Sequence, residues 1–354
     1  MDIRALAAVC LPFTALTADQ MDTIMQNPSP PIAKPSHTVN SSGRPQVAGG
    51  ANLFITADYL LWQATEENLT YAENSQLDTA GGANVPKAQW FTPKFNWESG
   101  VKVALGYNIG HDQWDTQLIW TWFEDDAKGH AKATSKNPEI YSTLTTPNLG
   151  VTCSEAETHL TVHLNVLDWE LGREFYVSKW MTLRPFGGLR TSWVNQHWNT
   201  AYEGIVNSRF SSLEVELEQE FWGIGLLGGL DTEWGLISGL SIYGNGAFSL
   251  LYGFFENERE EETVSVLGLK GTNLRIDKSR RNEQPTAELH LGLRWDQMFL
   301  NDHCHVRIQA GWDHLVFFEQ NRIPYFTDDF SSQSDEYSGN LAFQGWSASL
   351  RIDF

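Results

Sequence analysis

The final fourteen residues of the chain, 341–354, constrain its fold more than any other segment. Large apolar side chains, among them Trp346, Leu350 and Phe354, occupy every second position. The positions between them carry small or polar residues, including Arg351 and Asp353. A period of two residues is typical of a β-strand with one apolar and one polar face. We therefore expect a terminal strand whose apolar face is covered either by a protein core or by lipid.

The same alternation recurs along the chain from residue 53, and it predicts about ten strands. The connections between them alternate in length, with short turns at 110–113, 177–180, 235–239 and 299–302 and long loops at 64–94, 125–157, 199–211, 256–283 and 319–340. An even strand count with turns on one side and loops on the other is typical of outer-membrane barrels. We predict an all-β fold, a transmembrane antiparallel up-and-down β-barrel of about 10 strands (range 10–14), with short periplasmic turns and long extracellular loops.

The composition agrees with a barrel and not with a bundle of membrane helices. Only 41% of the residues are hydrophobic, but the chain has 15 Trp, 10 Tyr and 19 Phe, as expected of an apolar belt around a polar interior. One uncharged stretch, 234–255, is long enough for a membrane helix. Five glycines interrupt it and its apolar residues alternate, so we interpret it as part of two strands.

Two segments leave the strand pattern ambiguous. In 158–171 the apolar parity changes once, and a β-bulge near Val166 would explain the change. In 213–230 four glutamates, Glu214, Glu216, Glu218 and Glu220, share the parity of apolar residues such as Trp222. Either a bulge at 221–222 turns these carboxylates inward, or this end of the strand projects beyond the membrane into water, which we favour.

The N-terminal part of the chain does not continue the barrel pattern. Residues 1–18 have the features of a secretory signal, with Arg4 before a short apolar stretch, although a disordered N-terminus is the alternative. Residues 19–50 are expected to be a flexible lead-in, and 51–354 the barrel. Three cysteines cannot form a disulfide framework, and Cys153 and Cys304 should lie on opposite sides of the membrane, unbonded.

Two sequence patterns carry a resemblance to a known family. The first is an acidic-x-Leu-x-Trp segment at 58–62, and the second is a hairpin in 170–194 that contains Gly172, Arg173, Glu174, Phe175, Ser178, Lys179, Leu183, Arg184, Pro185, Phe186, Gly188, Leu189 and Arg190. From residue 53 to its C-terminus the chain resembles the Legionella-type major outer membrane protein family, which also occurs in environmental chlamydiae. The resemblance implies a pore-forming surface protein of the bacterial outer membrane, without catalytic residues or cofactors. The scarcity of cysteine argues against the cross-linked envelope network of the cysteine-rich chlamydial major proteins.

The C-terminal strand also resembles the terminal strand of outer-membrane barrels, whose final aromatic residue is part of the signal for the barrel assembly machinery. The residues that match this signal are Trp346, Leu350, Ile352 and Phe354. The partners expected from these resemblances are the assembly machinery, lipid and lipopolysaccharide, with a homo-oligomer as a further possibility. The net charge of −20 argues against nucleic acid, because phosphate binding needs clustered Lys and Arg.

Inward positions of the predicted strands carry charges that are candidates for lining a lumen: Asp58, Glu98, Lys102, Asp115, Asp168, Glu170, Arg184, Arg190, Glu288, Arg294, Asp296, Arg307, Asp313, Arg351 and Asp353. They favour a passive pore for small hydrophilic solutes or ions with a mild preference for cations. Alternatively, these charges only neutralise each other across neighbouring strands, with Arg351 and Asp353 facing Asp58. Ten strands leave little open space, unless a hidden hairpin in 64–94 or 256–283 widens the barrel.

Two other classes of function stay open at this point. A structural surface barrel or adhesin would act through the long loops. An outer-membrane hydrolase would need Asp and His pairs at the outer rim, for which the candidates are His159, His163, His197 and His314 with Asp125, Asp126 and Asp313. The chain has no Gly-x-Ser-x-Gly, His-Glu-x-x-His or phosphate-loop motif, so we expect no enzyme. His303, Cys304 and His305 are consecutive, so a strand would scatter them over alternate faces, with Cys304 opposite the two histidines, and we expect no metal site there.

Overall fold

The computed structural model describes residues 47–80, 83–109, 113–134, 139–146, 151–205, 210–326, 334–336 and 338–354, and these form strands, turns and loops without a helix. A search of these residues for a helix long and apolar enough to span a membrane finds none. The predicted signal segment 1–18 and most of the predicted flexible segment 19–50 lie outside the described residues. Of the cysteines, Cys153 and Cys304 are both free.

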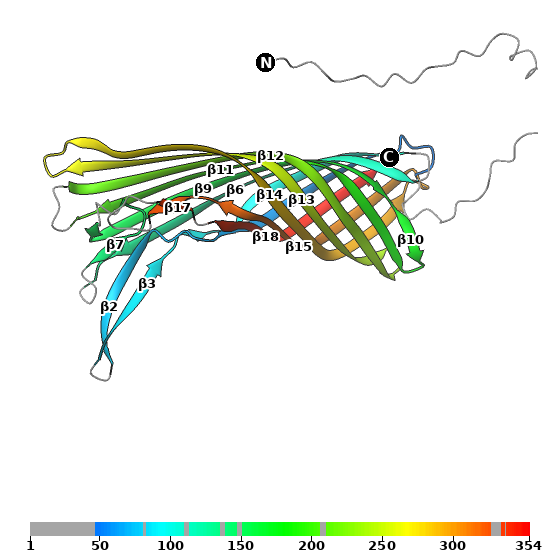
Figure 1. Cartoon of the computed structure of the whole chain (residues 1–354). Coiled ribbons are helices and arrows are strands. Elements are labelled where there is room, and N and C mark those ends of the chain that lie inside the picture. Colours follow the sequence, from blue (N-terminus) through cyan, green and yellow to red (C-terminus); the bar gives the residue numbers. More distant parts are fainter. Residues whose placement is uncertain are drawn as a thin grey trace, which may run out of the picture. The chain divides into compact units, whose positions relative to one another are not determined.

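Ten antiparallel strands close into a barrel, as predicted (Figure 1). In their order around the barrel they are β1 (Leu53–Glu66), β5 (Glu98–Asn108), β6 (Trp114–Lys132), β9 (Glu155–Arg173), β11 (Met181–Glu203), β12 (Phe210–Ile237), β13 (Leu240–Ser265), β14 (Lys270–Phe299), β15 (Cys304–Asn321) and β18 (Gly339–Asp353). The last strand closes the barrel by pairing with the first, from Phe54 opposite Asp353 to Glu66 opposite Leu341. Closure leaves no unpaired sheet edge, which a lipid environment requires.

The remaining strands lie outside the ring of ten. Two short ones extend barrel hairpins, β4 (Lys94–Phe95) beside β6 and β10 (Phe175–Ser178) beside β11. The others form a four-stranded sheet of β2 (Ala72–Ala80), β3 (Ala83–Phe91), β7 (Ile140–Ser142) and β8 (Thr152–Cys153), and a hairpin of β16 (Pro324–Phe326) and β17 (Ser334–Glu336). The loop 64–94 therefore does contain a hairpin, but that hairpin does not widen the barrel. Phe95 of β4 packs against the interior core.

The two faces of the barrel wall exchange their polarity along each long strand. In β6, Leu118 and Trp122 lie on the outer face and Gln117 on the inner face, whereas beyond Trp122 the outer face carries Glu124 and the inner face carries Phe123. The apolar outer face marks the part of the wall that contacts lipid, which we call the apolar band. On the side of the long loops the strands continue beyond this band into water. There the apolar side chains point into the barrel and form its core. The exchange divides the barrel into a polar half near the short turns and an apolar extracellular half.

This exchange corrects two sequence predictions. No bulge occurs near Val166, because β9 pairs in continuous register with both β6 and β11. The parity of the apolar residues changes there because β9 leaves the apolar band, and its apolar side chains move from the outer face to the inner face. The four glutamates Glu214, Glu216, Glu218 and Glu220 stay on the exposed outer face without a bulge at 221–222, so β12 projects beyond the band, as favoured above.

The long loops are shorter than predicted, because the strands extend into them. The charged segment 256–283 is not a loop but the outer part of the β13–β14 hairpin, which turns only at 266–269. Likewise β6 and β9 extend into 125–157, and β11 and β12 into 199–211. On the opposite side, the β12–β13 turn is tight and uses Gly239 at a φ of 77°, a conformation that favours glycine. The extended hairpins add no strand to the ring of ten.

The assignment of the faces can be tested with two neighbouring substitutions in β6. Leu118 is 49% exposed on the apolar band, so Leu118→Arg should lower the free energy of unfolding by about 2 to 4 kcal/mol if the side chain meets lipid at mid-depth. Gln117 faces the lumen and donates a hydrogen bond to Glu170 (2.6 Å), so Gln117→Arg should have a much smaller effect. Urea unfolding of the barrel in lipid vesicles measures both. Equal losses of stability would show that the faces are wrongly assigned.

Candidate functional site

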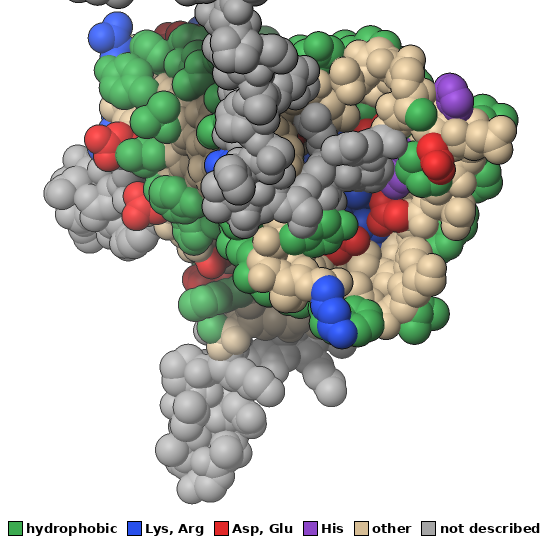
Figure 2. Space-filling view, turned by 90° about the vertical axis from the view of Figure 1, so that its right-hand side faces the viewer, with side chains coloured by type: hydrophobic (Ala, Val, Ile, Leu, Met, Phe, Trp, Pro, Cys, Tyr) green, Lys and Arg blue, Asp and Glu red, His purple; other side chains and the backbone are tan. Residues whose placement is uncertain are grey.

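The polar half of the barrel encloses a cavity of about 200 Å³. Viewed from the end with the short turns, hydrophobic side chains surround the outside and charged and histidine side chains are visible within (Figure 2). Its lining residues are charged or polar in most positions and come from all ten barrel strands. The charged lining residues are Asp58, Lys102, Asp115, Asp168, Glu170, Glu174, Arg184, Arg190, Asp231, Glu233, Glu288, His290, Arg294, Arg307, Asp313 and Arg351.

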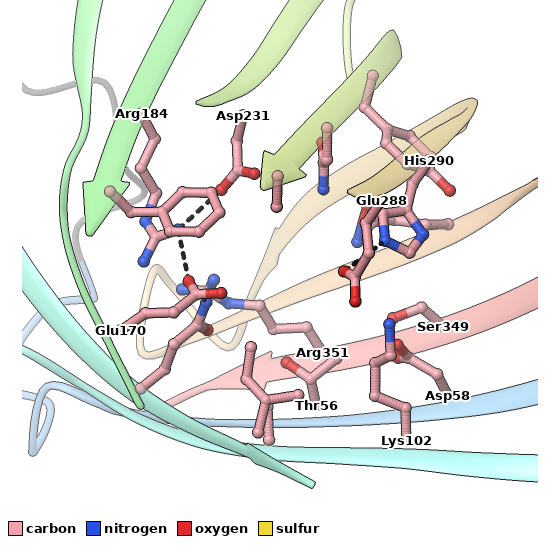
Figure 3. A pocket seen from close by; sticks show the side chains of 18 of the residues that line it. Thr56, Asp58, Lys102, Glu170, Arg184, Asp231, Glu288, His290, Ser349 and Arg351 are labelled. Atoms are coloured by element: carbon pink, nitrogen blue, oxygen red, sulfur yellow. Dashed lines mark hydrogen bonds and ion pairs between the residues drawn. The ribbon is translucent and has the colours of Figure 1, made fainter. Parts of the chain in front are cut away.

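Arg184 on β11 joins carboxylates from three other strands on one side of this cavity (Figure 3). Its Nη2 donates to Asp115 on β6 (2.6 Å), and its Nη1 lies 2.7 Å from Asp231 on β12 and 3.2 Å from Glu170 on β9. Gln117 donates a further hydrogen bond to Glu170. A planar guanidinium can serve several carboxylates at fixed angles, which suits it to this position. These contacts connect the four strands β6, β9, β11 and β12 across the lumen.

Arg190 forms a second charged group, which lies further from the short turns than the Arg184 group. Its guanidinium binds Asp168 through two parallel hydrogen bonds of 2.7 and 2.6 Å, and Nη2 also lies 2.7 Å from Glu288. Nη1 donates to the hydroxyl of Thr286 at 3.2 Å. Only 1% of Arg190 is exposed, so almost none of its charge is compensated by bulk water. Such a buried cation is stable only because its hydrogen-bond donors are occupied.

His290 extends this group across β14 and β15. One ring nitrogen lies 2.9 Å from Asp313 and the other 3.4 Å from Glu288. Asp58 on β1 lies directly opposite Lys102 on β5, and both side chains line the same cavity (Figure 3). Every lumen group described so far thus includes both signs of charge.

Two arginines on neighbouring strands lie closer to the short turns. Arg294 on β14 is 2.6 Å from Glu233 on β12, and Arg307 on β15 is 2.7 Å from Asp296, its direct partner across the β14–β15 ladder. Glu233 and Arg307 also line a second cavity that opens between the short turns. Because the two cavities share these residues, the polar cavity adjoins the cavity at the periplasmic mouth of the barrel.

A histidine beside this mouth connects the last strand to its neighbours. The ring nitrogens of His305 lie 2.8 Å from Asp353 on β18 and 3.0 Å from Asp296 on β14. Arg351 is 2.7 Å from Asp353 in the same strand. Arg351 therefore does not bind Asp58, which the sequence analysis expected it to face.

The predicted inward residues occupy three kinds of position. Twelve line the main cavity: Asp58, Lys102, Asp115, Asp168, Glu170, Arg184, Arg190, Glu288, Arg294, Arg307, Asp313 and Arg351. Asp296 lines the mouth, and Asp353 is buried beside His305. Glu98 differs, because it is exposed at the start of β5 and lines neither cavity.

Sequence reasoning missed several cavity residues. Asp231 and Glu233 lie just beyond Leu230, the last residue of the alternating segment 213–230 on which the prediction for this strand rests. Their parity is that of the inner face of β12, so continuing the alternation to the next turn would have found them. His290 had the right parity, but it was not counted as a lumen residue.

A packed apolar core fills the extracellular half of the lumen. Trp62, Phe123 and Phe343 are at most 1% exposed, and Phe123 lies with its ring centre 5.6 Å from each of the other two. Phe317 adds to the cluster at 6.4 Å from Phe343. The core includes more residues from every barrel strand except β5 and β14. This layer closes the lumen toward the long loops.

The candidate histidines of the outer rim lie on the outer wall, and they line neither the polar cavity nor the cavity at the periplasmic mouth. His159 is 3.2 Å from Asp126, and His163 is 3.4 Å from Glu124. Asp125 faces inward instead, where it accepts a hydrogen bond from the backbone of Ala64. Asp313 is also internal and binds His290, as described above.

One family model and several solved structures are similar to this chain. A model of the family described as "Legionella pneumophila major outer membrane protein precursor" matches residues 50–354. The outer membrane protease OmpT from Escherichia coli has a similar structure, with 14% identity, a TM-score of 0.44 and coverage of 86% of this chain and 98% of that chain. A FadL homologue of Pseudomonas aeruginosa (10%, 0.28, 85% and 89%) and its outer membrane protein OprG (10%, 0.27, 85% and 96%) are similar at a lower level. Among curated protein sequences none matches.

Proposed function

The chain belongs to the family of the Legionella pneumophila major outer membrane protein and lies in the bacterial outer membrane, and we propose that it is a narrow pore for small ions and hydrophilic solutes. The observation that carries the proposal is the polar cavity, which adjoins a second cavity at the periplasmic mouth. A lipid-facing barrel gains no stability from burying so many charges, because each must be paired or hydrated. A hydrated path for ions accounts for their presence.

The charge of the cavity supports a mild preference for cations. Its lining contains nine carboxylates (Asp58, Asp115, Asp168, Glu170, Glu174, Asp231, Glu233, Glu288 and Asp313) against six Lys and Arg side chains (Lys102, Arg184, Arg190, Arg294, Arg307 and Arg351). A lining with more carboxylates than cationic groups raises the local concentration of cations. Because most carboxylates are paired with Arg, the preference should be small.

The extracellular core supports a low conductance rather than free diffusion. A polar seam crosses this core, in which Gln196 donates to Glu66 (2.8 Å) and Gln219 donates to Gln196 (2.8 Å). Glu66 Oε1 and both side-chain polar atoms of Gln320 are buried without a hydrogen-bond partner. A cavity of about 20 Å³, enough for one water molecule, adjoins Glu66, Gln196 and Gln219. We propose that water in this seam provides a route for ions across the apolar core.

The protonation of Glu66 gives this route a pH dependence. Burial above the apolar band raises the pKa of Glu66 to about 8, so its carboxyl is mostly neutral at pH 7 and mostly charged at pH 9. A negative charge in the seam attracts cations. Cation current should therefore increase as the pH rises through about 8. Stability should decrease as the pH rises from about 4.5, the ordinary pKa of this carboxyl, to about 8, because the folded barrel binds this proton more tightly than the unfolded chain does.

Single-channel recording of the refolded full chain in a planar bilayer, under a salt gradient, tests the proposal. We expect small steps with a cation-biased reversal potential, larger at pH 9 than at pH 7. Glu66→Gln should remove the pH dependence and keep the steps at pH 7. Steps with the same pH dependence in the variant would contradict the route through the seam. A folded barrel that conducts nothing would contradict the pore itself.

A folded barrel that conducts no current would favour the second candidate function, a structural surface barrel or an adhesin. The observation behind this alternative is the apolar core, which gives the extracellular half the packed interior of a rigid support. The longest hairpin, β13–β14, exposes Val266, Leu267 and Leu269 at its tip, with exposed fractions of 67%, 84% and 69%. Such a tip is suited to contact a partner rather than to guide ions.

A further inference from the structure

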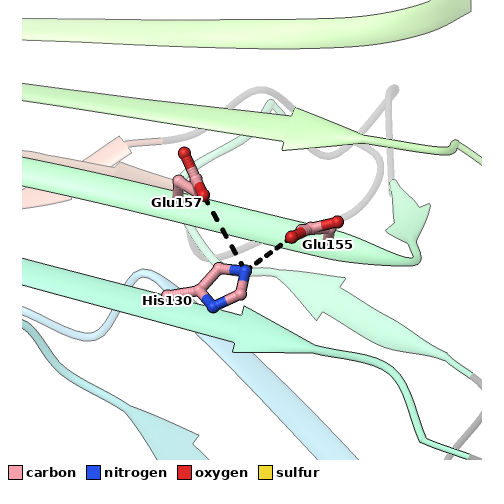
Figure 4. A group of neighbouring side chains, drawn as sticks. All are labelled: His130, Glu155 and Glu157. Carbon is pink, nitrogen blue, oxygen red and sulfur yellow. Dashed lines mark hydrogen bonds and ion pairs between the residues drawn. The ribbon is translucent and has the colours of Figure 1, made fainter.

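Three side chains with metal-binding groups meet on the outer wall of the barrel, above the apolar band. His130 lies on β6 directly opposite Glu157 of β9, and Glu155 is the diagonal neighbour of His130 in the same ladder (Figure 4). Their ligand atoms all lie within 4.8 Å of one another. His130 follows Trp122, near the upper edge of the apolar band, by eight residues along the strand. At roughly 3.3 Å per residue, this distance places the group well outside the hydrocarbon.

The distances within this group fit a small divalent cation. His130 Nε2 is 2.6 Å from Glu155 Oε1 and 3.8 Å from Glu157 Oε1. In tetrahedral zinc sites, metal–ligand distances of about 2.1 Å separate neighbouring ligand atoms by roughly 3.4 Å. The two observed distances lie on either side of this value. Because one nitrogen faces both carboxylates, a metal could bind all three side chains after small rotations.

The surroundings favour binding of a cation at this position. The second oxygen of Glu155 is 3.4 Å from Lys132, which leaves Oε1 directed toward His130 Nε2. The β6–β9 ladder runs in regular register from Trp114 to Lys132, which fixes the Cα positions of the group. The side chains are exposed by 49% for His130, 28% for Glu155 and 71% for Glu157, so water can reach the metal.

We propose that His130, Glu155 and Glu157 form a binding site for a divalent metal ion of the zinc class, with a coordination position open to water. Imidazole nitrogen with carboxylate oxygen suits Zn²⁺ better than Mg²⁺ or Ca²⁺, which prefer oxygen ligands alone. The sequence analysis predicted no metal ligands, because the three residues become neighbours only through the extension of β6 and β9 into the predicted loop 125–157. The site is independent of the proposed pore.

A similar group on the same wall provides an internal comparison. His197 on β11 lies directly opposite Glu218 of β12, with Glu216 as the diagonal neighbour. However, its Nδ1 faces Glu218 (3.2 Å) and its Nε2 faces Glu216 (3.5 Å). One metal ion binds one nitrogen of a ring, so this ring would have to turn before a metal could contact both carboxylates. We expect the His197 group to bind metal more weakly than the His130 group.

Titration of the refolded full chain with Co²⁺ and Zn²⁺ tests the site. Co²⁺ should give the visible absorption of a four-coordinate complex, and Zn²⁺ should displace it at one equivalent. His130→Gln should abolish the band, and Glu157→Gln should weaken binding by more than about tenfold. His197→Gln is the matched control and should leave the band unchanged. All variants should migrate as folded, heat-modifiable barrels, because these side chains are exposed.

Three results would overturn the proposal. The first is a wild-type barrel without the visible Co²⁺ band. The second is a band that persists unchanged in His130→Gln. The third is a band that is lost equally in His197→Gln and His130→Gln, since that would indicate weak binding along the whole acidic wall instead of one site.

Discussion

Replacing Arg190 by Met is expected to lower the free energy of unfolding by about 3 to 5 kcal/mol, among the largest effects of any single substitution in this barrel. The guanidinium binds Asp168 through two hydrogen bonds and also contacts Glu288, and only 1% of the residue is exposed. Methionine fills a similar volume but leaves two buried carboxylates without their cation. The cost therefore comes mainly from uncompensated charge and not from lost packing.

Urea unfolding in lipid vesicles, followed by tryptophan fluorescence, measures this loss. In the Arg190→Met background, Asp168→Asn together with Glu288→Gln should restore most of the stability, because the carboxylates are then neutral. Arg275→Met is the control, since Arg275 is 60% exposed and its ion pairs with Glu258 and Asp277 should contribute less than about 1 kcal/mol. No recovery in the triple variant would mean that Arg190 acts through packing and not through its charge.

Alternation of polarity was sufficient to predict the barrel within the apolar band. Trp346, Leu350 and Ile352 do face outward, and the turns at 179–180, 238–239 and 300–303 overlap three of the predicted short turns. Most of the fourth predicted turn, 110–113, lies outside the described residues. The extracellular half was harder to predict, because period-two alternation identifies two faces but does not say which one faces solvent. Leu160 and Leu164 are inward core residues, whereas Leu167 and Leu171 face outward, and only the height of the strand relative to the lipid decides between them.

Charge placement could be predicted better than charge pairing. The parity of Arg184 and Asp115 indicates that both face the lumen, but their contact depends on the strand order β6–β9–β11 and on the register of two ladders. Arg351 illustrates the difference, because it faces inward as predicted yet binds Asp353 and not Asp58. An arginine side chain is long enough to reach several carboxylates. The alternation of polar and apolar residues does not predict which of them it binds.

The extracellular core leads to the second large effect. Phe123→Ala should lower the free energy of unfolding by about 3 to 5 kcal/mol, because Phe123 is fully buried and lies between Trp62 and Phe343. If this core limits the current, the same substitution should also increase single-channel conductance. The cavity left by the ring would adjoin the polar lumen. Thr121, the next residue after Phe123 on the inner face of β6 toward the short turns, is the first polar residue outside the core.

Comparison with Phe248→Ala separates the effect on stability from the effect on conductance. Phe248 is 54% exposed on the outer face, so its loss should reduce contact with lipid while conductance stays at the wild-type value. Larger steps in Phe123→Ala alone would identify the apolar core as the barrier to ions. Unchanged steps in a destabilised Phe123→Ala barrel would show that ions do not cross the core near this ring. The polar seam around Glu66 and Gln219 would then carry the current without help from the aromatic cluster, because Gln196 and Gln219 lie on β11 and β12, whereas Trp62, Phe123 and Phe343 lie on β1, β6 and β18.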